Sequence, residues 1–168
     1  MSRLEQLISE LCPDGVEFVE LWSITIWDKR FNSVDREKQP KVISYPYLLA
    51  ADYLCDGEVV SIPWGKSRPV KEVLKYYKGK FVTADNRIAT SNDTTKLLNK
   101  YLYYWMLNNS ESIDGFYRGS GIKHPNMNDV LNMKVQLPPL EIQREIVRIL
   151  DNFTELIAEL IAELTARI

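Results

Sequence analysis

Residues Leu137–Thr165 read LPPLEIQREIVRILDNFTELIAELIAELT, and this stretch decides the fold. Pro138 and Pro139 fix the backbone just ahead of a helix, where a missing N–H costs nothing, and Glu141 meets the positive end of the helix dipole. No glycine or proline interrupts the pattern from there to Ile168. The pattern predicts a single helix of about 43 Å at 1.5 Å per residue, which is longer than a domain of this size.

Apolar side chains along this helix recur at alternating steps of four and three residues, which is the heptad spacing of a coiled coil. A second apolar stripe runs beside the first, and together they make a face too wide for a solitary surface helix. We therefore expect a partner helix, in this chain or in another. The expected pairing residues are Ile142, Ile146, Ile149, Leu150, Phe153, Leu156, Ile157, Leu160, Ile161 and Leu164.

The composition is that of an ordinary soluble globular protein. The chain has 168 residues, of which 45% are apolar and 26% charged, enough for one domain plus an appended element. No apolar run approaches the roughly 20 residues that span a bilayer, and the N-terminus lacks a signal-peptide pattern. Cys12 and Cys55 have no metal-ligand spacing, so we expect small buried residues in a reducing cytoplasm.

Charge is unevenly placed along the chain, although the net charge is only −2. Residues 1–20 and 140–168 are acidic, so the middle of the chain is basic. Within the middle, a single acid, Glu72, faces a basic run made of Lys66, Arg68, Lys71, Lys75, Lys78 and Lys80. A basic centre between acidic ends suits a phosphate-binding face, although a lysine run is more often a solvated surface.

The segment between the two ends has mixed α/β patterning. Strands are expected at Val16–Leu21, Trp22–Trp27, Val42–Tyr47, Glu58–Pro63, Lys80–Thr83 and Lys134–Leu137. Helices are expected at 2–11, Lys96–Asn109 and, capped by Asn126, through Leu131. Turn sequences occur at Pro13–Gly15, Asp56-Gly57 and Trp64-Gly65. The expected fold class is therefore α/β (α+β), a mixed domain between a short N-terminal helix and a long C-terminal helix.

The aromatic residues of the Lys96–Asn109 helix have two interpretations. Tyr101, Tyr103, Tyr104 and Trp105 could form a platform for stacking bases. At helical spacing, however, such residues more often belong to the core.

The chain also contains two segments of similar sequence, one near each end. Residues Glu5–Leu11 resemble Glu155–Leu160 and the overlapping Glu159–Leu164. The chain thus ends in a sequence much like the one that precedes its globular part. A longer relative could repeat the whole unit.

Three stretches resemble the specificity (S) subunits of type I restriction–modification systems: Leu4–Phe18 (LEQLISELCPDGVEF), Gly119–Asn128 (GSGIKHPNMN) and, above all, Leu137–Thr165. Residues 20–115 match loosely, as the resemblance implies for a target recognition domain that varies with the DNA sequence read. The resemblance implies a conserved helix at 1–15, a recognition domain at 16–137 and a coiled-coil spacer or dimerisation helix at 138–168. Typical members have two recognition domains, so this chain resembles a half-length subunit.

The resemblance also implies the partners. Two modification (M) subunits would carry S-adenosylmethionine and methylate adenine, and restriction (R) subunits would add ATP- and Mg-dependent translocation and cleavage. This chain would bind double-stranded DNA, pair with a second copy through its C-terminal helix, and hold no cofactor of its own.

Residue patterns for catalysis are weak. The tetrapeptide Leu137–Leu140 has two prolines but lacks the polar first residue that holds an adenine amine, and His124 has no cysteine or acidic pair at metal spacing. The acids Asp52, Asp56 and Glu58 are better explained as turn residues flanking a strand than as a metal site. We expect a non-catalytic subunit; a methyltransferase or nuclease fragment with residual activity, or a silent recombination cassette, remain alternatives.

DNA contacts are expected from two polar loops. Trp64, Lys66, Ser67 and Arg68 follow a strand, where Arg68 could reach guanine and Lys66 a phosphate. Arg118 and the segment up to Lys123 form the second loop. For each residue the alternative is a solvated surface, and for His124–Asn126 it is a structural turn and helix cap.

Overall fold

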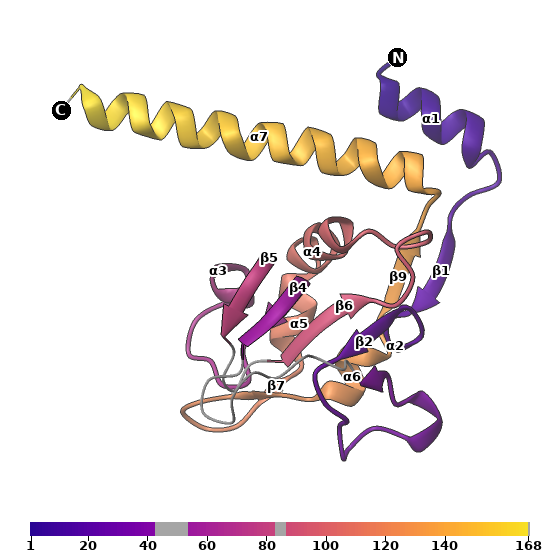
Figure 1. Cartoon of the computed structure of the whole chain (residues 1–168), viewed down its shortest axis with the longest axis vertical. Coiled ribbons are helices and arrows are strands. Elements are labelled where there is room, and N and C mark those ends of the chain that lie inside the picture. Colours follow the sequence, from indigo (N-terminus) through magenta and orange to yellow (C-terminus); the bar gives the residue numbers. More distant parts are fainter. Residues whose placement is uncertain (43–53, 83–86, 168) are drawn as a thin grey trace.

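The computed structural model describes residues 1–42, 54–82 and 87–167. A mixed α/β domain lies on one side of a long helix, α7 (Leu140–Ala166), and the short helix α1 (Arg3–Leu11) lies near the start of α7 (Figure 1). This architecture confirms the expected fold class. None of the helices in the described residues is long and apolar enough to cross a membrane.

The described residues form a sheet of five strands in the order β3-β2-β6-β4-β5. Neighbours are antiparallel except β2 and β3, which are parallel. Val60 of β4, an interior strand, pairs with Ala89 on one side and Tyr76 on the other. The bounds are β2 (Thr25–Trp27), β3 (Lys41–Val42), β4 (Leu54–Ile62), β5 (Lys75–Val82) and β6 (Arg87–Ser91).

A two-stranded pair joins the beginning of the domain to its end. β1 (Glu17–Glu20) runs antiparallel to β9 (Lys134–Leu137), with Val19 opposite Val135. Because α1 precedes β1 and α7 follows β9, this pairing brings the two helices together. The remaining elements are α2 (Leu21–Ile24), the 3₁₀ turn η1 (Arg36–Lys38), α3 (Val70–Val73), α4 (Asn99–Asn108), α5 (Ser110–Gly115), α6 (Met127–Leu131) and the hairpin β7 (Tyr117–Arg118)–β8 (His124–Pro125).

The main core packs α4 against the sheet, and buried residues of α2 belong to the same cluster. Trp27, Leu102 and Met106 are among its buried members. Tyr101 and Trp105 are 6% and 8% exposed, so the interpretation of these two α4 aromatics as core residues is confirmed. Buried between layers, they are not available to stack on bases.

Side chains cap two of the helices. The predicted cap is confirmed, because Asn126 caps α6 by accepting the Asp129 N–H at 3.3 Å. Ser2 also caps α1, accepting the Glu5 N–H at 3.1 Å while the Glu5 carboxylate accepts the Ser2 N–H at 2.7 Å, a cap that was not predicted. These signals are local, since each depends on residues three positions apart.

The predicted strand Trp22–Trp27 is wrong in its first half. One turn of helix, α2, precedes β2, and side chains bond back to the backbone: Thr25 Oγ1 donates to the Leu21 carbonyl at 2.6 Å. Ser23 Oγ donates to the Glu20 carbonyl at 2.6 Å. Such side-chain bonds compete with extended backbone and favour a turn.

The predicted turn at Asp56-Gly57 is also wrong. Both residues lie inside β4, where Asp56 pairs with Lys80 and Gly57 with Gly79. Asp56 and Glu58 are therefore strand residues and not turn acids, while Asp52 lies outside the described residues. A long antiparallel partner, β5, supplies the backbone hydrogen bonds that override the local turn signal.

Other boundaries shifted, and some elements were missed. β5 begins at Lys75, earlier than the predicted Lys80–Thr83, and β6 and α5 were not predicted. α4 begins at Asn99, later than the predicted helix, because Asp93 accepts the Thr95 N–H at 2.9 Å and holds a turn there. Most of the predicted strand Val42–Tyr47 lies outside the described residues.

Candidate DNA-contact loops and helix-pairing face

The structure brings the two predicted DNA-contact loops together. Lys66, after β4, and Lys123, before β8, form an antiparallel bridge in which each backbone N–H donates to the other's carbonyl, at 3.1 and 3.2 Å. β7 and the chain next to it lie on the side of the domain away from α7 (Figure 1). One surface at the domain's far end therefore carries both loops.

Trp64 is the centre of an aromatic cluster at this end. Its ring centroid lies 4.7 Å from that of His124, whose Nδ1 is 2.9 Å from the Trp64 carbonyl oxygen. The Arg87 guanidinium lies 3.8 Å above the Trp64 ring. Arg87 was missed as a site residue because it lies in β6, a strand that was not predicted.

Lys66 is held inside the loop. Its Nζ lies 2.6 Å from Asp114 Oδ1, its side chain is only 10% exposed, and it sits 4.6 Å from the Tyr117 ring centroid. Asp114 also accepts the Val70 N–H at 3.0 Å. The Lys66 ammonium thus ties its loop to α5 and is turned away from solvent.

The other charged residues of the loops are more open. Arg68 is 66% exposed, with Nε 3.8 Å from Glu72 Oε2, and Ser67 and Lys123 are exposed. Arg118 is exposed, but its guanidinium donates to the Gly115 and Tyr117 carbonyls. Arg68, Ser67 and Lys123 share a hollow of about 300 Å³ with Lys66, Pro69, Asp114 and Gly121.

Glycine is required in the second loop. Gly119 and Gly121 have φ of +129° and +83°, a region that other residues rarely adopt. A Cβ on Gly119 would also lie 3.2 Å from the Ile122 carbonyl oxygen. The loop's path, and so the position of Lys123, depends on these two residues.

The basic run continues along β5, at the edge of the described sheet. Lys75, Lys78 and Lys80 are exposed there, and Lys78 Nζ lies 3.9 Å from Glu58 Oε2. Lysines on an edge strand also prevent pairing with other sheets, so this row has a structural explanation independent of DNA.

The expected pairing face of α7 divides into two parts. Ile142 is 2% exposed and packs with Leu7 and Cys12, and Ile146 and Leu150 are half-buried. The rest is open, with exposures of 38% to 65% for Ile149, Phe153, Leu156, Ile157, Leu160, Ile161 and Leu164. Within the part of the chain that the structure describes, only the beginning of the stripe is therefore covered.

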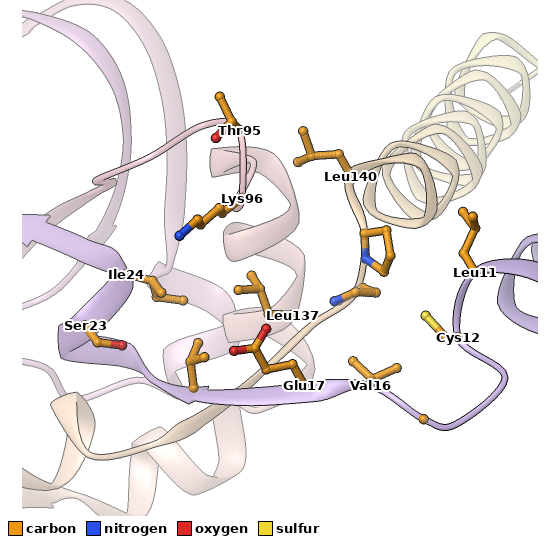
Figure 2. Close-up of a pocket in the computed structure, with 14 residues that line it drawn as sticks. Leu11, Cys12, Val16, Glu17, Ser23, Ile24, Thr95, Lys96, Leu137 and Leu140 are labelled. Atoms are coloured by element: carbon orange, nitrogen blue, oxygen red, sulfur yellow. The ribbon is translucent and has the colours of Figure 1, made fainter.

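A hollow of about 620 Å³ lies where α1, β1 and the start of α7 meet (Figure 2). Leu11, Cys12, Val16 and Leu140 contribute side chains to it, with Glu17 and Lys96 as charged members. Among the described residues no group of three or more His, Cys, Asp or Glu is placed to hold a metal ion.

The fold is a mixed α/β domain carried on a long helix. The family model for the type I restriction modification DNA specificity domain matches residues 51–168, more than half of the chain. The chain belongs to this family, and it carries a single recognition domain.

Curated relatives agree with this assignment. Over 90 residues the chain is 42% identical to the EcoR124I/EcoR124II specificity subunit of Escherichia coli, covering 48% of this chain and 21% of that protein. Over 108 residues it is 32% identical to a Haemophilus influenzae protein assigned as a type I restriction enzyme specificity subunit, covering 64% of this chain and 27% of the other. The matches thus span about a quarter of these relatives' length.

A solved structure supports the fold. The S subunit of a type I restriction–modification system from M. genitalium superposes with a TM-score of 0.59 at 15% identity. The match covers 89% of this chain and 42% of that one.

Proposed function

We propose that this chain reads a DNA sequence for a type I restriction–modification complex and performs no chemistry itself. The observation that carries the proposal is the meeting of the 64–68 and 119–123 loops on one surface of the recognition domain. Methylation of adenine, with S-adenosylmethionine, would take place on M subunits, and ATP- and Mg-dependent cleavage on R subunits. Such a complex would work on DNA in the cytoplasm.

In this proposal the residues of the loop surface have different tasks. Arg68 and Lys123, both exposed, contact phosphates or base edges, with Ser67 beside them. Trp64 supports the surface through its ring contacts, and Lys66 holds the loop in place through Asp114. Arg118 contributes from the start of the second loop. In this proposal Lys66 supports the loop and does not make the phosphate contact that the sequence had suggested.

The open part of α7 would be covered by a second copy of the chain. Seven large apolar side chains in this part of the helix have exposures of 38% or more, an extent of apolar surface that favours association. These side chains recur at the heptad spacing of a coiled coil, which favours a second helix as the partner.

The assembly would then read a bipartite site with symmetry-related halves, and two M subunits would dock on it. Purified chain, M subunit and their mixture are incubated with DNA and labelled S-adenosylmethionine. We expect methyl transfer only in the mixture, and sequencing of the methylated DNA reveals the target. Transfer by the chain alone would support a catalytic fragment instead, and a chain that never joins the M subunit would refute the assembly.

A further inference from the structure

Gln143, on the first turn of α7, is fully buried yet polar. Its Oε1 accepts the Leu98 N–H at 2.9 Å, and its Nε2 donates to the carbonyls of Lys96 and Pro138 at 2.7 and 2.9 Å. Leu98 is the N-cap of α4, where the N–H has no partner within the helix. The side chain of Gln143 therefore provides hydrogen-bond partners for backbone groups of the loop that leads into α4.

A second polar contact joins the same two helices two turns further along. Asp151 of α7 accepts from the Tyr104 hydroxyl at 2.5 Å through Oδ1 and from Lys100 Nζ at 2.9 Å through Oδ2. Burial, together with the neighbouring Asp151 carboxylate, raises the pKa of Tyr104 to about 12. The hydroxyl therefore stays protonated throughout the physiological range of pH and can donate its hydrogen bond to Asp151.

The two contacts act together as a brace. Eight residues separate Gln143 and Asp151, which is about 12 Å along a helix. A single attachment leaves the long helix free to swing about it, whereas two attachments to α4 hold its direction. α4 in turn is packed into the core that carries the DNA-contact loops. The direction of α7 is thus coupled to the position of the loops.

We propose that Gln143 and Asp151 are positioning residues that set the angle between α7 and the recognition domain, and so set the separation at which a paired assembly reads its two half-sites. This rests on the proposed function, because it assumes that paired chains read DNA. One extra base pair between half-sites changes their separation by about 3.4 Å and their relative rotation by about 34°. A rigid assembly distinguishes such spacings, whereas a hinged one tolerates them.

The first experiment measures spacer preference. The complex with the M subunit methylates a DNA library in which the two half-sites are separated by different numbers of base pairs. We expect Asp151→Ala to lower the preference for the best spacer over its neighbours by about threefold or more. Glu155→Ala, which removes the same charge from an exposed position one turn further along, should behave like the natural chain. If Asp151→Ala lowered methylation equally at every spacer length, or left the spacer preference unchanged, the proposal would be overturned.

The second experiment does not require DNA. Spin labels at Glu111, on α5, and Glu163, on α7, report the distance between domain and helix in a chain with Cys12 and Cys55 replaced by serine, diluted with unlabelled chain. We expect one narrow distance distribution for the natural residues and for Glu155→Ala, and a broader one for Asp151→Ala and Gln143→Leu. If the distributions stay narrow, the brace does not exist; if they broaden but no sequence is read, the proposed function fails and the brace stands.

Discussion

Replacing Leu156 and Leu160 with alanine tests the pairing face of α7. The two side chains are 51% and 50% exposed, so a partner helix would cover about half of each. Full burial of a leucine is worth about 1.5–3 kcal/mol, and the open half therefore about 1 kcal/mol. A symmetric dimer contains four such side chains, which gives a loss of about 4 kcal/mol and a dimer dissociation constant raised roughly a thousandfold.

The substitutions should leave the folded chain intact, because alanine is the best helix former and neither side chain belongs to the described core. Sedimentation equilibrium measures the dissociation constant, and circular dichroism during urea unfolding checks the fold. Ile8→Ala on α1 is a matched control, since Ile8 is 41% exposed and lies outside the expected pairing set. A natural chain that stays monomeric at all concentrations, or a dissociation constant unaffected by the double substitution, would refute the reasoning.

Three further predictions concern the loops and the base of α7. Arg68→Ala and Lys123→Ala should each weaken DNA binding and reduce the slope of log affinity against log salt by about 0.9, measured by fluorescence anisotropy; an unchanged slope would mean no phosphate contact. Lys66→Met leaves its carboxylate partner uncompensated and should lower the free energy of unfolding by about 1–3 kcal/mol, measured in urea, so an unchanged value would contradict the supporting role. The hydrogen bonds from Arg148 lower the pKa of Glu145, so the stability from this pair is present above the ordinary carboxyl pKa and lost as the pH falls below it. Glu145→Gln should therefore destabilise the chain at neutral pH, and this loss of stability should shrink as the pH falls through the lowered pKa of Glu145. A loss of stability that does not change with pH would contradict the role of the pair.

The exposures of the predicted pairing residues show what apolar periodicity can and cannot predict. Ile142 and Ile149 look equivalent in a heptad pattern, yet Ile142 is 2% exposed and Ile149 38%. Leu7, more than 130 residues away, covers the first and not the second. Spacing along a helix indicates which side is apolar, but not what covers it.

The loop residues show the same limit. Lys66 and Arg68 both belong to one basic loop in the sequence, but a carboxylate 48 residues away holds only Lys66. Arg87 lies against Trp64 beside the DNA-contact loops, and no local sequence pattern could indicate this contact. Strand β6, which carries Arg87, was missed because its place between two other strands depends on pairing and not on its own composition.

The sequence by itself determined the elements whose signals are local: the long helix after Pro139, the short helix near the N-terminus, the capped helix that follows Asn126, and the mixed α/β class. Periodicity, caps and proline act within a few residues, so they can be read in order along the chain. The tertiary structure decided which part of α7 stays open, which lysine is held, and how Gln143 and Asp151 fasten the helix to α4. These outcomes depend on contacts between residues far apart in sequence, whose partners exist only once the chain has folded.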